Sequence, residues 1–213
     1  RWGALRLGYT EVPGDPLLRA AIAALHPGVE ADDVIVWTGA EEPIFALVNV
    51  LLGPGDHLVA VVPTYQSHVS VARACGAEVD EVALEEGADG WSLDLDRVRA
   101  AIRPTTRAIA VAIPNNPTGW LPDRATLDAL VAIAEEADAV LLADEVYRRL
   151  EHDPADALPA AAELSSRAVS VGAMAKAWGL AGLRIGWTVC RDRELNRRLC
   201  GFKGYTTICN ASP

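Results

Sequence analysis

The sequence has no long apolar run, no cluster of basic residues and no signal pattern at its start. No apolar stretch reaches the length of a membrane span, and the opening residues do not resemble a secretory signal. The net charge is −10 and no run of Lys or Arg occurs. We therefore expect neither a membrane nor a nucleic acid as a partner.

Cysteine and histidine are scarce and scattered along the chain. The four cysteines contain no C-x-x-C pair, and the four histidines share no spacing typical of metal ligands. The pattern predicts no metal site. It favours reduced thiols, which indicate a cytoplasmic protein.

The remaining composition is that of a globular domain. Apolar residues make up 51% and charged residues 23% of the 213 residues, enough for one large domain with a full core. The chain begins at Arg1 rather than at a methionine and ends in TTICNASP. Neither end is typical of a natural terminus, so we expect a part of a longer protein.

Short apolar runs rich in β-formers alternate with helical patterns. The predicted strands are 34–38, 57–62, 77–84, 107–114, 139–145, 168–172 and 184–190. The predicted helices lie near 15–25, 41–52, 66–75, 94–102, 123–137 and 192–202, with Asp123 as a cap. EEGADGW (85–91) is interpreted as a surface turn. The alternation predicts an α/β fold with a mostly parallel seven-stranded sheet and helices on both faces.

Ligands of an open α/β sheet bind beyond the carboxyl ends of its strands. Polar residues follow the apolar runs at 38–40, 63–65, 115–116 and 144–147, and around Lys176. We predict that these segments face one cleft.

The run ADAVLLADEVYRRL (137–150) ends a buried strand with a carboxylate, Asp144, followed by a phenol, Tyr147. A buried charge costs free energy unless a partner pairs with it. Lys176 lies in GAMAKAWGLAGLRIGW (172–187), where the neighbours are small and apolar, and Arg184 follows in the same segment. Desolvation of Lys176 would lower its pKa and make it a nucleophilic amine. Alone, either cation is better explained as a surface residue, and it is their combination that favours a site.

Three further segments carry candidate ligand contacts. IPNNPTGW (113–120) predicts either an ordinary turn or a rigid loop that presents the Asn116 amide. In WTGAEEPIFAL (37–47), Gly39, Ala40 and Glu41 begin a helix whose exposed amides favour phosphate, with the acidic side chains turned away. Tyr65 in VVPTYQS (61–67) can stack on a flat ring or pack as a lid.

One ligand unites these features. Pyridoxal phosphate needs a lysine for its aldehyde, a carboxylate for its ring nitrogen, donors for its phenolic oxygen, an aromatic on its ring face and an anion site. The residues that fill these roles in turn are Lys176, Asp144, Asn116 with Tyr147, Tyr65, and Gly39-Ala40 with Arg184. The partner of Asp144 would then be a pyridinium.

The chain resembles the fold-type I, class I/II aminotransferases, which depend on pyridoxal phosphate. The matching runs, in the family's order, are GYTEVPGDPLLRAAIA, TGAEE, PTY, NNPTG, DEVY, AMAK and GLRIGW. The resemblance implies that residues 1–213 are the cofactor-binding large domain, that 1–25 lead into it, and that the C-terminal small domain lies outside this chain. It makes Lys176 the Schiff-base lysine and proton carrier, and assigns Arg184 to the phosphate. It also implies a homodimer in which Tyr9 reaches the phosphate of the neighbouring subunit.

The chain departs from the family pattern near the lysine. The Ser or Thr expected three residues before Lys176 is Ala173, so the phosphate has one donor fewer, and Ser170 has the wrong spacing to replace it. The arginine that grips the substrate carboxylate and the N-terminal segment that closes over the substrate are absent from this sequence.

The leading hypothesis is amino transfer from an L-amino acid to a 2-keto acid. Ala173 and GYTTICNASP resemble a divergent branch of capreomycidine synthase-like and arginine-oxidase-like enzymes. An oxidase or hydroxylase for an arginine-type substrate, or an eliminating cyclase of an antibiotic pathway, is therefore an alternative. A non-catalytic aminotransferase-like domain is a third hypothesis, and an α/β domain with an unrelated ligand is a fourth.

Overall fold

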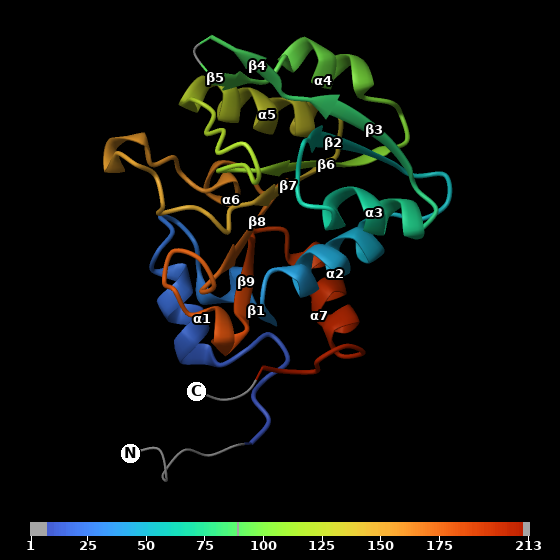
Figure 1. Cartoon of the computed structure of the whole chain (residues 1–213). Coiled ribbons are helices and arrows are strands. Elements are labelled where there is room, and N and C mark those ends of the chain that lie inside the picture. The colour runs from blue at the N-terminus through green and yellow to red at the C-terminus, as the bar shows by residue number, and fades with distance from the viewer. Residues whose placement is uncertain (1–7, 89, 211–213) are drawn as a thin grey trace.

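Seven strands form one sheet through the middle of the computed structural model, which describes residues 8–88 and 90–210 (Figure 1). Across the sheet they are β1 (Val34–Thr38), β9 (Ile185–Cys190), β8 (Ala168–Ala173), β7 (Val140–Asp144), β6 (Thr106–Ala112), β2 (His57–Val62) and β3 (Glu78–Ala83). Only β9 runs antiparallel to its neighbours within the described sheet. The predicted sheet is confirmed, although residues 1–7 of the expected N-terminal segment lie outside the described range.

Helices cover both faces of the sheet, as predicted. One face carries α2 (Glu41–Leu51), α3 (Ser67–Ala74) and α7 (Arg193–Lys203) (Figure 1). The other carries α1 (Pro16–Ala23), α4 (Leu95–Ala101), α5 (Arg124–Glu136) and the short α6 (Ala161–Leu164), which the sequence did not predict. The Asp123 cap is present, because its Oδ1 accepts a hydrogen bond from the Thr126 amide at 2.8 Å.

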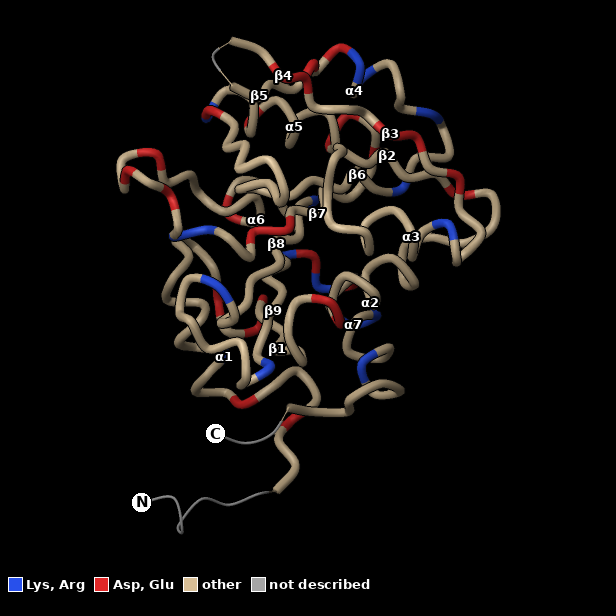
Figure 2. Tube along the Cα trace, in the orientation of Figure 1, with Lys and Arg blue, Asp and Glu red and all other residues tan. Residues whose placement is uncertain are grey.

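Alternate residues of each strand face opposite helical layers. In β2, Leu58 and Ala60 pack under α2 and α3, whereas Val59 and Val61 pack under α4 and α5. A strand buried on both faces reads as a continuous apolar run, which is why these strands were predictable. Figure 2 shows the charged residues mainly on helices and connections; β1, β8 and β9 contain none.

The segment 85–91 lies at the surface as expected, but it is a hairpin and not a simple turn. This segment forms a small hairpin of β4 (Glu85–Gly87) and β5 (Gly90–Ser92), which pair antiparallel. Trp91 is half-buried and packs against the core beside α4 and α5. That burial holds the segment against the domain, which a free turn would lack.

Candidate functional site

A cavity of about 260 Å³ opens at the carboxyl ends of β6, β7 and β8, next to the start of α2. Eight residues singled out from the sequence line it: Ala40, Glu41, Tyr65, Asn116, Asp144, Tyr147, Lys176 and Arg184. They come from segments up to 144 positions apart (from 40 to 184) and meet because parallel strands bring their carboxyl ends to one edge. Gly39 lies directly beside this group, and Tyr9 lies outside it.

Asp144 ends β7 and projects into the cavity although it is only 6% exposed. Its Oδ1 accepts a hydrogen bond from the Val146 amide at 3.2 Å. Its Oδ2 lies 3.3 Å from Nε2 of His68, in a contact too poorly aligned for a hydrogen bond. His68 is fully buried in α3, and its Nδ1 lies 2.9 Å from the Thr64 hydroxyl.

His68 is therefore a residue of the site that sequence reasoning missed. An imidazole beside Asp144 gives this carboxylate a partner inside the chain, so the pyridinium is not the only candidate. The sequence contained a local signal for the position of His68. Thr64 lies four residues before it, and α3 begins between the two.

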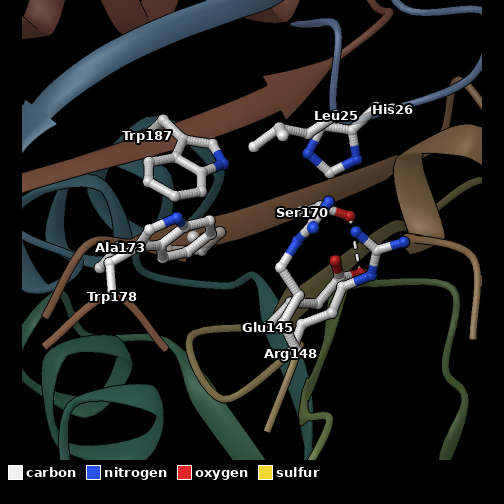
Figure 3. A pocket seen from close by; sticks show the side chains of 11 residues that line it. Leu25, His26, Glu145, Arg148, Ser170, Ala173, Trp178 and Trp187 are labelled. Atoms are coloured by element: carbon white, nitrogen blue, oxygen red, sulfur yellow. Dashed lines mark hydrogen bonds between the residues drawn. The ribbon is translucent and has the colours of Figure 1, made fainter. Parts of the chain in front are cut away.

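Glu145, the next residue, projects to the opposite face of the sheet. Its Oε1 accepts hydrogen bonds from the Ala161 amide (2.7 Å) and the Ser170 hydroxyl (2.8 Å), while its Oε2 is buried with no partner among the described residues. Burial raises the pKa of Glu145 to about 7. Figure 3 shows this pair with Arg148 beside it and Trp178 and Trp187 across a small separate pocket.

Ser170 is therefore committed to Glu145 and does not line the cofactor-sized cavity. Its hydroxyl also accepts a hydrogen bond from the Ala162 amide at 3.0 Å. Ala173 does line the cavity, at the end of β8. The expectation that Ser170 cannot replace the missing hydroxyl at position 173 agrees with this geometry.

Lys176 lines the cavity, but the expected desolvation is wrong, because its side chain is exposed. The lysine follows the end of β8 on a turn outside the sheet layer, so the apolar residues around it in sequence do not cover it. Its Nζ lies 5.3 Å from the centre of the Tyr147 ring. The amine is thus available from the cavity, next to the phenol that follows Asp144.

The two asparagines of the loop after β6 have different environments. Asn115 is buried and structural: its amide donates to the Pro63 carbonyl (3.0 Å), and its Oδ1 accepts from the Thr118 amide and hydroxyl (3.2 and 2.8 Å). Asn116 is half-buried and lines the cavity. The rigid-loop interpretation of NNPTG therefore fits better than a free turn.

Arg184 lies against the turn that begins α2. Gly39 adopts φ +75°, and a Cβ on it would come within 2.5 Å of the Arg184 guanidinium. The backbone angle favours glycine at this position, and a side chain there would displace the Arg184 guanidinium. The Arg184 guanidinium also donates to the Ala181 carbonyl at 3.2 Å. A cation and the amides at a helix start thus converge at one end of the cavity, a suitable anion site.

The two acidic residues at the start of α2 behave differently. Glu42 is held back by the Thr38 amide on Oε2 and by the Thr206 and Thr207 hydroxyls on Oε1, each at 2.7 Å. Burial alone would raise the pKa of Glu42, but these hydrogen bonds bring it below the usual value. Glu41 lines the cavity with its Oε1 3.3 Å from the Ser67 hydroxyl.

The two other tyrosines that the sequence predicts for the site are solvent-accessible. Tyr65 is 50% exposed at the cavity, and Tyr9 is 88% exposed away from it. A single chain therefore gives Tyr9 no ligand to touch. Among residues 8–88 and 90–210, no helix is long and apolar enough to cross a membrane.

Comparison with known proteins agrees with this geometry. The family described as "Aminotransferase class I and II" matches residues 3–211. A probable N-succinyldiaminopimelate aminotransferase of Mycobacterium tuberculosis is 36% identical over 96% of this chain, and capreomycidine synthase of Streptomyces vinaceus is 34% identical over 92%. The structure of a PLP-dependent aminotransferase from Streptococcus suis superposes with a TM-score of 0.91, at 34% identity over 99% of the chain.

The chain spans about half the length of these proteins. It covers 53% of the mycobacterial protein, 49% of the Streptomyces protein and 55% of the Streptococcus structure. The structural match covers 99% of this chain, so the shared half includes the residues described above.

Proposed function

Because the chain belongs to the class I and II aminotransferase family, which uses pyridoxal phosphate, we propose that the full protein transfers the amino group of an L-amino acid to a 2-keto acid. One observation carries the proposal. The sequence contains two lysines, and Lys176 faces the cavity with Asp144 and Arg184, whereas Lys203 is enclosed elsewhere. We propose that residues 1–213 are the cofactor-binding large domain.

The residues present fit the cofactor. An anion site made by Arg184 and the start of α2 lies at one end of the cavity, and the Asp144 carboxylate lies among the same lining residues. The Arg184 guanidinium lies beside Gly39, at the turn that begins α2. Asn116 and Tyr147 supply an amide and a phenol for the phenolic oxygen, and Tyr65 supplies a ring to stack on the pyridine.

The proposed mechanism divides the work among these side chains. Pyridoxal phosphate, when bound, supplies a ring that accepts the electron pair of the broken Cα–H bond of the substrate. Lys176 would hold the aldehyde carbon through its amine, and, once displaced by the substrate amine, would take up and return the Cα proton. Asp144 would keep the ring nitrogen protonated, and His68 would orient the Asp144 carboxylate.

Two features of the whole protein belong to the proposal. The small-molecule partners are an L-amino acid and a keto acid acceptor. The active protein is a homodimer in which Tyr9 reaches the partner's phosphate site, and the exposure of Tyr9 supports this. The four cysteines are free thiols, which supports a cytoplasmic location.

Reductive trapping tests the proposal. The full-length protein is loaded with pyridoxal phosphate, reduced with borohydride, digested and analysed by mass spectrometry. The pyridoxyl group is expected on the peptide that contains Lys176. Modification of Lys203 instead, or no modification with normal turnover, would contradict the proposal. An Arg124→Ala variant, changed at an exposed residue of α5, serves as the control for labelling.

A second candidate function is favoured by Ala173 and by the similarity to capreomycidine synthase. We propose it as the alternative: oxidation, hydroxylation or eliminating cyclisation of an arginine-type amino acid, in an antibiotic pathway. Amino transfer to a keto acid under argon supports the first function. Oxygen consumption with arginine, or cyclised product without a keto acid, supports the second.

A further inference from the structure

Lys203, at the end of α7, is fully buried without a carboxylate bonded to it. Its Nζ donates three hydrogen bonds: to the Val12 carbonyl (2.6 Å), the Val36 carbonyl (2.5 Å) and Oδ1 of Asn210 (2.9 Å). An ammonium has three protons for these three oxygens. Burial lowers the pKa of Lys203 to about 8, so at pH 7 the three protons are present in most molecules.

The oxygens belong to three parts of the chain that are far apart in sequence. Val12 follows the segment that carries Tyr9, Val36 lies in β1, and Asn210 is near the end of the described chain. In Figure 1 the first (blue) and last (red) described segments run side by side below β1, and the Thr10 hydroxyl donates to the Asn210 carbonyl at 3.2 Å. Lys203 therefore links these three segments through its hydrogen bonds.

The same segment contacts the turn that begins α2, residues 38–42, here called the phosphate turn. The Asn210 amide donates to the Thr38 hydroxyl at 3.5 Å, and the Thr206 and Thr207 hydroxyls hold Glu42, whose other oxygen binds the Thr38 amide. Val36, the Lys203 acceptor, precedes this turn by two residues. The phosphate turn is therefore supported from behind, while Ala40 and Arg184 face the cavity.

An anion site of backbone amides binds well only when the amides are already aimed at the anion, because ordering a backbone on binding costs free energy. The chain lacks a hydroxyl at position 173, so the phosphate turn and Arg184 would carry more of the contact to a bound phosphate. We propose that Lys203 is a positioning residue that holds the phosphate turn in its binding shape and thereby sets the affinity for the cofactor phosphate. This inference rests on the proposed function.

The test compares two ligands that differ in the phosphate. Dissociation constants of pyridoxal phosphate and of pyridoxal are measured for the full-length protein, for Lys203→Met and for Thr188→Val. Thr188 is the matched control because it is fully buried and accepts a hydrogen bond from the β1 residue Trp37 at 3.0 Å without contacting the phosphate turn.

Lys203→Met is expected to weaken pyridoxal phosphate about tenfold and to leave pyridoxal within about twofold, and Thr188→Val to leave the ratio unchanged. Equal weakening of both ligands by Lys203→Met, or no change, would overturn the inference while the proposed function stands. A wild-type protein that binds no pyridoxal phosphate would overturn both.

A second variant covers the case in which Lys203→Met does not fold. Asn210→Ala removes one acceptor and the Thr38 contact but leaves Lys203 its two carbonyls. It is expected to weaken pyridoxal phosphate about threefold relative to pyridoxal. Hydrogen exchange without cofactor gives a separate readout: amides of 38–42 should exchange faster in Asn210→Ala than in Thr188→Val. Identical exchange in both variants would count against the role of the segment.

Discussion

The two lysines of this chain lie in opposite surroundings, and so do two consecutive carboxylates. Lys176 and Asp144 line the cavity, whereas Lys203 is enclosed in the interior. Glu145 is as buried as Asp144 but lies on the other face of the sheet, at the small separate pocket. Lys203 and Glu145 are satisfied mainly by the chain itself: Lys203 by three oxygens and Glu145 by an amide and a hydroxyl. The cavity groups keep atoms available for a ligand.

Burial also shifts the pKa of each of these two groups, Glu145 and Lys203, in the direction that favours its uncharged form. Burial raises the pKa of Glu145 to about 7 and lowers the pKa of Lys203 to about 8. The same residue types thus occur both in the cavity and in buried hydrogen-bond networks. The predictions below compare substitutions of residues at the cavity with substitutions of residues away from it.

The largest effect is expected from Lys176→Ala, which removes the cavity amine. Amino transfer should fall at least about 1000-fold, because the nucleophile and the proton carrier are lost together. The measurement is a single-turnover assay of the cofactor absorbance with amino acid and then keto acid. Arg124→Ala, on an exposed helix face, should be unaffected. Full turnover in Lys176→Ala would remove the distinction between the two lysines.

The neighbouring carboxylates provide the second test. Asp144→Asn should lower turnover by about 100-fold or more, because a preorganised charge at the reacting group is lost. Glu145→Gln should lower it by less than about tenfold, because its side chain lies on the other face of the sheet. Steady-state rates at saturating cofactor measure both. Equal losses in the two variants would mean that turnover depends on an intact strand end and not on the carboxylate in the cavity.

Glu145 should also make stability depend on pH. Its folded pKa, about 7, lies above the ordinary value of 4.5, so its favourable contribution is present below pH 4.5 and is lost as pH rises through 7. Across this window the free energy of unfolding of wild type should fall by about 3 kcal/mol relative to Glu145→Gln. Urea unfolding of both proteins from pH 4.5 to 8 measures the difference. A constant difference would show that Glu145 titrates normally.

A smaller effect than those of Lys176→Ala and Asp144→Asn is expected from His68→Gln. The imidazole lies 3.3 Å from Asp144, and losing one contact to a charged group should lower turnover about tenfold. Thr64→Val, which frees only the far side of the ring, should have a weaker effect of the same sign. Turnover should stay unchanged in Thr188→Val. A loss as large as that of Asp144→Asn would make His68 more than a positioning residue.

Much of the site was predictable because of where it lies in the fold. Asp144, Asn116 and Tyr65 each follow an apolar run, and the carboxyl ends of parallel strands meet at one edge. His68 was not predicted, although the sequence places it four residues after Thr64. The hairpin at 85–91 was missed because turn residues dominate its composition, and the half-burial of Trp91 depends on helices elsewhere in the chain.

The sequence by itself determined the alternation of strands and helices, the order of the motifs and the residue types available at each strand end. Local patterns carry this information, because period and turn chemistry act over a few residues. Only the tertiary structure decided which charges are enclosed. Lys176 was expected to be desolvated and is exposed, whereas Lys203 is buried by partners 191 and 167 positions away. Burial is set by segments that meet in space, and no local pattern reports it.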